Sequence, residues 1–432
     1  MSGDSASTFP KSAIIAAILT KTCFNSTIRF LFPFLAYFAE DMGISLDKFS
    51  QTVLVAAEVS ALVATFMSSW VSKYGSTKIC TLCCIFGGLS NVGVLLLPSK
   101  LQSTSSLVIL CLLRLIFGVT FNLLNSSVQS SIVHNVDEGV IGKITGIVES
   151  SWTMGALSFV FVGKILSTYG WKGPFIVNGI LMLLMSPLIY KYMPLDSDNP
   201  TTSKVVLVAS TNSSGDDVVA SVCPTSWWKE VTSWKVMSLL GCLLLRDGGM
   251  YLVLSSYSLW LEEDWDFEAE EAGTASLVIS LGEATAVVAM SLLSDRIGLE
   301  RNMLGVTLLI VLTSLGIGAF EGSSLYASLG FLGLGFVCFE WGAILTIAIT
   351  GSSVEASDVR IIMLAIMFTT MALARSFSAI FVDLLFSNYG MRGIALIASG
   401  MQLCGVMLLA TRGTDNIKIK EGGGWGWEER QM

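Results

Sequence analysis

The hydrophobic positions of this chain gather in runs of about 20 residues, the length of α-helix that crosses the hydrocarbon core of a bilayer. Polar positions lie mainly between these runs. The pattern predicts an all-α membrane protein with twelve transmembrane helices. The predicted spans are 12–38, 50–72, 79–98, 106–128, 143–166, 174–193, 236–260, 272–293, 302–320, 325–349, 360–385 and 391–411.

A polar stretch at 194–235 divides the spans into six and six. Its first two-thirds are rich in Ser, Thr, Asp and Asn, so we expect a loose linker. Its end suits a helix lying at the membrane interface or, alternatively, the ragged start of the seventh span, because it carries Trp227, Trp228, Lys229, Trp234 and Lys235. The predicted parts are an N-terminus at 1–11, a six-helix bundle at 12–193, the linker, a second six-helix bundle at 236–411 and a tail at 412–432.

Two short patterns occur once in each half. "STYGWKG" at 167–173 is echoed by "SNYGMRG" at 387–393, and "VSKYG" at 71–75 is echoed by "SDRIG" at 294–298. The two echoes occupy matching places in the order of spans and have similar offsets along the chain. They predict two pseudo-symmetric six-helix bundles related by a two-fold axis along the membrane normal.

The composition agrees with a membrane protein and excludes several other classes. Only 13% of the 432 residues are charged, against about 25% in soluble domains, and the mean hydropathy is +0.71. The net charge of −8 and the lack of any basic run argue against nucleic acid as a partner. The single histidine, His134, argues against a histidine-based metal or catalytic site. We expect no metal, no cofactor and no enzymatic activity, and the missing phosphate loop argues against an ATP-driven pump.

The loop lysines and arginines predict the orientation. If the N-terminus is cytoplasmic, fifteen of them fall on the inner side and very few on the outer side, so both termini are expected in the cytoplasm. The inner set is Lys11, Lys73, Lys78, Lys143, Lys191, Lys204, Lys229, Lys235, Arg296, Arg301, Arg360, Arg412, Lys418, Lys420 and Arg430. The outer set is Lys48, Lys100, Lys172 and Arg392, with Lys164 close to it. The sequence does not distinguish a plasma membrane from an organelle membrane.

Charged side chains inside the predicted spans are the candidates for function, because a charge at mid-bilayer costs a few kcal/mol or more. None of the main candidates falls on the third, sixth, ninth or twelfth span. They are Lys21, Arg29, Glu58, Arg114, Glu149, Arg246, Asp247, Glu283, Glu340 and Arg375. Polar and aromatic neighbours on the same spans are Asn25, Asn122, Asn125, Trp152, Tyr251, Tyr257 and Trp341.

A proton-coupled carrier needs a buried carboxylate that gains or loses its proton as its surroundings change. Glu283 is the first choice, because it lies about halfway along its span. Arg114 is the expected cation. Glu149 lies nearer the cytoplasmic end and is expected in a gate or in a structural pair with Arg114, and for each carboxylate a structural salt bridge remains an alternative. Trp152, one helical turn from Glu149, is expected at the substrate site.

Four segments resemble the major facilitator superfamily. "SLLSDRIGLERN" is similar to its cytoplasmic motif G-x-x-x-D-R-x-G-R-[RK], with Asp295, Arg296 and Gly298 in register. "LLRLIFGVTFN" is similar to the R-x-x-x-G motif in the fourth span of proton-coupled members. "GKITGIVESSWTMGALS" and "RFLFPFLAYFAEDMGIS" are similar to segments of the twelve-span drug/proton antiporter-like members.

The resemblance implies the major facilitator fold, with spans one, four, seven and ten around a central cavity. It also implies that Asp295 and Arg296 join a gating charge relay, to which Lys73 and Gly75 of the first-half loop correspond. The alternative for Asp295 and Arg296 is a helix-end cap with ordinary positive-inside charge. The first-half loop departs from the motif, since Ser72 stands where the family has Asp.

The sequence therefore predicts a secondary active transporter of a small organic solute, coupled to protons as a symporter or antiporter. Alternating access of two six-helix bundles in the lipid bilayer is the expected mechanism, and the monomer is the expected functional unit. Two alternatives stay open: a facilitative uniporter, for instance of sugars, and a transporter-like sensor that moves nothing. The sequence names neither the substrate nor the direction of transport.

Overall fold

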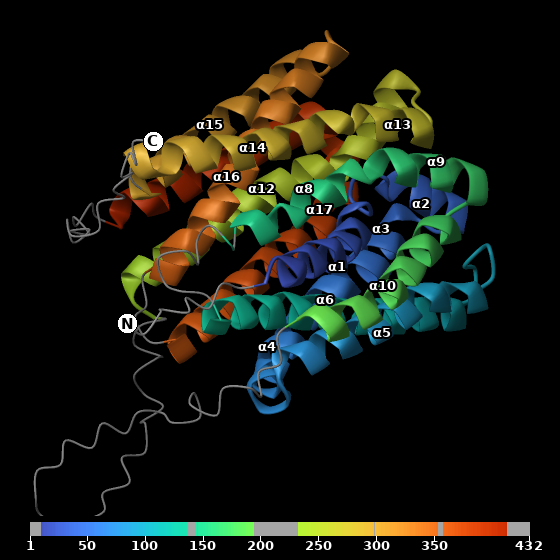
Figure 1. Cartoon of the computed structure of the whole chain (residues 1–432). Helices are drawn as coiled ribbons and strands as arrows, with labels where there is room; N and C mark the ends of the chain where they lie inside the picture. The colour runs from blue at the N-terminus through green and yellow to red at the C-terminus, as the bar shows by residue number, and fades with distance from the viewer. Residues whose placement is uncertain are drawn as a thin grey trace, which may run out of the picture.

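The computed structural model describes residues 10–135, 144, 146–193, 232–297, 299–352 and 357–412, and every regular element in them is helical. The helices run back and forth along one common direction (Figure 1). The start of α1 and the finish of α17 lie at one end, called the near end below. Helices α2, α9 and α13 lie at the opposite end, called the far end (Figure 1).

The first half contains ten labelled elements besides a short 3-10 turn. They are α1 (Lys11–Arg29), α2 (Leu35–Met42), α3 (Leu46–Phe49), the π-helical turn η1 (Ser50–Val55), α4 (Ala56–Tyr74), α5 (Ser76–Val92), the 3-10 turn η2 (Gly93–Leu96), α6 (Thr104–Asn135), α8 (Ser151–Leu157), α9 (Phe159–Tyr169) and α10 (Lys172–Tyr192). The second half contains α12 (Trp234–Trp265), α13 (Ala269–Ala275), α14 (Leu277–Ile297), α15 (Leu299–Phe320), α16 (Leu325–Ser352) and α17 (Ser357–Thr411).

These helices confirm the predicted all-α architecture. Each of the twelve predicted spans is helical over most of the part that the structure describes. Within those residues, eight helical segments are long and apolar enough to cross a membrane, and the last of them, Met363–Thr411, covers both the eleventh and the twelfth predicted span. Other spans are interrupted. The first consists of α1 and α2 with a turn at 30–34 that contains Pro33, and the fifth breaks at Ser158 between α8 and α9.

The internal repeat reappears in the backbone. Gly170 ends α9 with φ 71° and ψ −175°, and Gly390 kinks α17 with φ 60° and ψ −172°. Glycine adopts such a positive φ without the steric cost that a side chain brings. The "YG" pairs of the two echoed segments therefore mark the same turn between the last two spans of each half, which is what a doubled six-helix unit requires.

The surface carries the apolar belt that a bilayer demands. Large aliphatic side chains stand exposed along α15, including Leu304, Leu308 and Leu312, and along the last part of α17, including Leu403 and Met407. Exposed apolar patches of this extent mark contact with membrane or protein. Both segments lie in predicted spans that carry none of the main candidate charges, so they suit a position facing lipid.

The buried apolar side chains form three cores. The largest joins both halves, and includes Phe32 and Phe159 of the first half with Tyr251 and Leu261 of the second. The other two each belong to one half. One packs α1, α4, α5, α6 and α10 together, and the other packs the start of α12 against α17 between Met363 and Met371. Among the described residues, the halves thus share one core and keep one core each.

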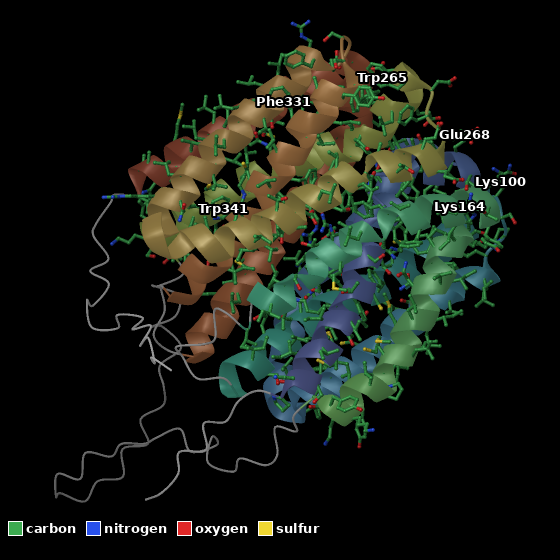
Figure 2. All side chains as sticks on the ribbon, turned by 45° about the horizontal axis from the view of Figure 1, so that its top comes forward. Lys100, Lys164, Trp265, Glu268, Phe331 and Trp341 are labelled. Carbon is green, nitrogen blue, oxygen red and sulfur yellow. The ribbon has the colours of Figure 1, made fainter. Side chains whose placement is uncertain are left out.

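Contacts between the halves seal the far end. The Tyr37 hydroxyl donates a hydrogen bond to the Phe267 carbonyl oxygen at 2.6 Å, and Lys164 of α9 pairs with Glu270 of α13 at 2.8 Å. Figure 2 shows Lys164 and Glu268 at this end of the molecule. Glu268 and Glu271 form a capping box at the start of α13.

Two glycines let α9 and α13 meet backbone to backbone in this seal. A Cβ atom on Gly163 would lie 2.5 Å from the Ala269 carbonyl oxygen and 3.2 Å from the Gly273 Cα. A Cβ atom on Gly273 would lie 3.0 Å from the Phe159 carbonyl oxygen. Small residues at such crossings allow close van der Waals packing between membrane helices.

Gly118 makes a similar contact inside the first half, and it is the glycine of the R-x-x-x-G segment. A Cβ atom there would lie 2.0 Å from the Ala57 carbonyl oxygen and 2.1 Å from the Ser60 Oγ. We therefore expect Gly118→Ala to push α6 away from α4 and to lower the melting temperature of the purified protein, at a cost of about 1–3 kcal/mol. Gly305→Ala is the matched control, because nothing lies within 4 Å of its added Cβ. Equal melting temperatures for the two variants would contradict this account of the crossing.

Candidate functional site

A small pocket, called the cavity below, lies between the two halves and is lined by residues of both. Its charged wall consists of Arg29, Glu149 and Glu340, and its aromatic wall of Trp152, Tyr251, Phe339 and Phe368. All three cores reach it. Trp152 packs on the core of the first half, Tyr251 belongs to the shared core, and Met371 belongs to the core of the second half.

An ion pair between Arg29 and Glu283 connects the halves beside this cavity. The Arg29 guanidinium at the last residue of α1 donates to both carboxylate oxygens of Glu283 on α14, one of them at 2.7 Å. It also donates to the Trp152 carbonyl oxygen at 2.9 Å and lies 5.3 Å from the centre of the Trp152 ring. Arg29 is 3% exposed and Glu283 is fully buried, so the pair lies in a water-poor interior.

A second ion pair between the halves joins Glu58 of α4 to Arg375 of α17. The Arg375 Nε and Nη2 donate to the two carboxylate oxygens at 2.7 and 2.8 Å. The guanidinium also lies 5.6 Å from the centre of the Tyr251 ring, which lines the cavity. A bidentate pair of this kind fixes orientation as well as distance, so the two pairs set how the halves sit on each other.

The other buried ion pairs of the described residues stay inside one half. The Lys21 Nζ lies 2.6 Å from a Glu149 oxygen, and Gln129 donates to the same oxygen. On α12, the Arg246 Nη2 lies 2.7 Å from Asp247. The prediction that Glu149 pairs with Arg114 is wrong, because Lys21 of α1 occupies that place and Arg114 lies elsewhere.

Among the described residues, Arg114 and Glu340 are the buried charged side chains that form no ion pair. The Arg114 Nε donates to the Val53 carbonyl oxygen of the π-helical turn at 3.4 Å, and its guanidinium carbon lies 4.5 Å from the Phe117 ring centre. Its Nη1 and Nη2 atoms have no partner in the described part of the chain. Arg114 forms no ion pair with Glu149, Glu283 or Glu58, which pair with Lys21, Arg29 and Arg375, so its role as the coupling cation stays a prediction.

Glu340 on α16 is 5% exposed and lines the cavity. No hydrogen bond or ion pair joins it to any residue that the structure describes. It is thus the one candidate carboxylate in the described ranges that faces the cavity without a partner of its own.

The predicted gating motif lies largely outside the described side chains. Gly75 separates α4 from α5 with φ 88°, which explains a glycine at that position. The backbone at 295 and 296 belongs to the last turn of α14, while Gly298 and the side chains of Lys73, Asp295 and Arg296 lie outside the described part. Their gating role stays a prediction.

The structure brings several predicted site residues together and leaves others apart. Arg29, Glu149, Trp152 and Glu340 line the cavity, and Tyr251, noted only as a neighbour, does so too. Glu58, Glu283 and Arg375 lie in the pairs between the halves, Arg246 and Asp247 lie within the second half, and Arg114 lies apart. Sequence reasoning did not single out Phe339 or Phe368, because an apolar aromatic residue on an apolar helix has no distinguishing signal.

Comparison with known proteins agrees with this architecture. The model of the Major Facilitator Superfamily matches residues 16–236, which is just over half of the chain. The chain belongs to the major facilitator superfamily. No curated protein matches this member of the superfamily, so its subclass is not assigned, and the resemblance to drug/proton antiporters stays a prediction.

Solved structures share the fold of this superfamily member along nearly its whole length. The proton:xylose symporter XylE bound to 6-bromo-6-deoxy-D-glucose has a TM-score of 0.71 and 14% identity, over 94% of this chain and 96% of that one. A D-xylose-proton symporter has a TM-score of 0.72 and 14% identity, over 93% of this chain and 97% of that one. The fold and the family together make the protein an integral, multi-pass membrane transporter and not an enzyme.

Proposed function

We propose that the protein is a proton-coupled secondary transporter of a small organic solute, working by alternating access of its two halves. The observation that carries the proposal is the placement of buried carboxylates. Glu58 and Glu283 hold the halves together through arginines, and Glu340 faces the cavity between them. A facilitative carrier has no need for titratable groups at these positions.

The coupling follows from the cost of separating these pairs. For the far end to open, the helices that carry Arg29 and Glu283 must move apart. Breaking a buried pair leaves a charge without compensation and costs several kcal/mol. A proton taken up by the carboxylate removes one of the two charges, so protonation and the change of conformation favour each other.

The test is transport by purified protein in liposomes with an imposed pH gradient and a set of candidate solutes. We expect the gradient to drive accumulation by the unaltered protein. Glu283→Gln should remove the accumulation and leave at most equilibration, because the amide cannot exchange a proton. Asp47→Asn is the matched control, since Asp47 is exposed on α3 and its carboxylate accepts a hydrogen bond only from Gln51 in the described residues.

Flux that ignores the pH gradient in the unaltered protein would overturn the proposal and favour the uniporter. A pH response that survives in Glu283→Gln would remove Glu283 from the coupling and leave Glu340 as the candidate. A sensor would show no flux with any solute while still binding one of them.

We also propose that both termini face the cytoplasm, which places the far end on the outer side. The support is the excess of lysine and arginine in the loops of the near end. Lys100 at the far end has a side chain 55% exposed. In intact cells, a membrane-impermeant maleimide should therefore label Lys100→Cys and should not label Lys11→Cys; the reverse pattern would invert the orientation.

A further inference from the structure

The charges on the cavity wall do not cancel. Arg29 donates two hydrogen bonds to the Glu283 carboxylate, which compensates its charge, and one to the Trp152 carbonyl oxygen. Glu149 forms an ion pair with Lys21, whose Nζ lies 2.6 Å from the Glu149 Oε1. Glu340 remains without a counter-ion among the described residues, so the wall of the cavity presents one carboxylate in excess.

Four charged groups act electrostatically on Glu340. Arg29 is the one cation among them, and Glu283, Glu149 and Asp247 are the anions. Lys21 and Arg246 neutralise Glu149 and Asp247 within their own halves. Since Arg29 can compensate one carboxylate and faces two, the cavity keeps a negative potential that attracts a cation.

The rest of the wall suits the body of an organic molecule. Trp152, Tyr251, Phe339 and Phe368 present rings, and aromatic faces attract a weakly hydrated cation. The remaining lining is aliphatic and consists of Ala343, Ile344, Ile347 and Met371. A bare metal ion requires several oxygen, nitrogen or sulfur ligands, and the described residues contain no group of three or more that could hold one.

We infer that this cavity binds an organic monocation with an apolar or aromatic body, that Glu340 is its counter-ion, and that a proton and the cation compete for Glu340. The inference rests on the proposed transport function and names its substrate class. One proton leaves the carboxylate as one cation arrives, so the exchange at the site is electroneutral.

The first test uses two probes of equal shape and different charge. Phenyltrimethylammonium carries a permanent positive charge, and tert-butylbenzene has the same shape without it. Calorimetric titration of the purified protein should show the cation binding about tenfold to a hundredfold more tightly than the neutral probe, as expected for a contact with a charged partner. The affinity for the cation should weaken as the pH falls, because protonated Glu340 is neutral, while the affinity for the neutral probe should not change.

The second test removes the carboxylate. Glu340→Gln should lower the affinity for phenyltrimethylammonium by about tenfold to a hundredfold and abolish its pH dependence. Asp47→Asn removes one carboxylate at an exposed position and should leave both unchanged. Phe368→Leu keeps an apolar side chain without the ring, so it should lower the affinity for the cation more than the affinity for the neutral probe.

Equal affinity for the two probes in the unaltered protein would overturn the inference, and so would unchanged affinity and pH dependence in Glu340→Gln. If Glu340→Gln fails to fold, the comparison of the two probes against pH in the unaltered protein decides alone. Accumulation of a neutral or anionic solute by a pH gradient, without binding of the cation, would defeat the inference and leave the proposed function standing. Binding of the cation through Glu340, together with flux that ignores the pH gradient, would support binding at Glu340 and overturn the proposed proton-coupled function.

Discussion

Glu58→Leu is expected to lower the free energy of unfolding by about 3–5 kcal/mol and to abolish transport. The reason is that Arg375, which is 3% exposed, keeps its charge after both hydrogen bonds to Glu58 are lost. The guanidinium is then left buried without the carboxylate that compensates its charge. Thermal or denaturant unfolding of the purified protein measures the first effect, and solute uptake by liposomes measures the second.

The double variant Glu58→Leu/Arg375→Leu separates stability from function. Replacing both members of a buried pair by apolar residues is often neutral or stabilising, so the double variant should recover most of the lost stability. It should not recover transport, because the halves would then be held by apolar contact that no proton can release. Recovery of full, pH-dependent transport would show that this pair serves only to hold the fold together.

Gly163→Leu is expected to disfavour the conformation in which the far end is closed. The new side chain meets the Ala269 carbonyl oxygen, whose position the Gly163 Cβ would approach to 2.5 Å, and backbone cannot yield as a flexible side chain does. Overpacking costs about 1–3 kcal/mol, which shifts the equilibrium between the two conformations by about 5- to 150-fold. Uptake should fall by a similar factor while the protein stays folded, since each half keeps its own core.

Gly400→Leu is the matched control for this change. It adds the same side chain on α17 at an exposed glycine with nothing within 4 Å of the added Cβ. Its uptake should stay near that of the unaltered protein. If Gly163→Leu transports equally well, the close crossing of α9 and α13 is not part of the transport cycle.

Much of the fold follows from the sequence because a bilayer imposes strong constraints on it. Apolar length determines where a span lies, and the cost of a buried charge confines such residues to helices that face protein. The repeat of Gly170 at Gly390 can be recognised in the sequence, and the two glycines have matching φ and ψ angles. The even number of spans followed from the same repeat.

The partners of the buried charges did not follow from the sequence. Pairing depends on how each helix is rotated and tilted, and one sequence contains no measure of either. Glu149 and Arg114 illustrate this, because they have opposite charges on predicted neighbouring spans yet do not meet. The break at 30–34 was missed for a related reason, since an apolar turn buried in protein has the same hydropathy as an apolar helix.

The distribution of the ion pairs also determines whether the halves can be exchanged between related transporters. Lys21–Glu149 and Arg246–Asp247 each lie within one half, whereas Arg29–Glu283 and Glu58–Arg375 each draw one residue from either half. An exchange of whole halves between relatives keeps both residues of Lys21–Glu149 and of Arg246–Asp247 together. The same exchange separates Arg29 from Glu283 and Glu58 from Arg375. A chimera that joins this N-terminal half to another C-terminal half would leave Arg29 and Glu58 unpaired unless the new half carried residues equivalent to Glu283 and Arg375. Although the two halves repeat the same turn at Gly170 and Gly390, these two ion pairs make each half depend on the other.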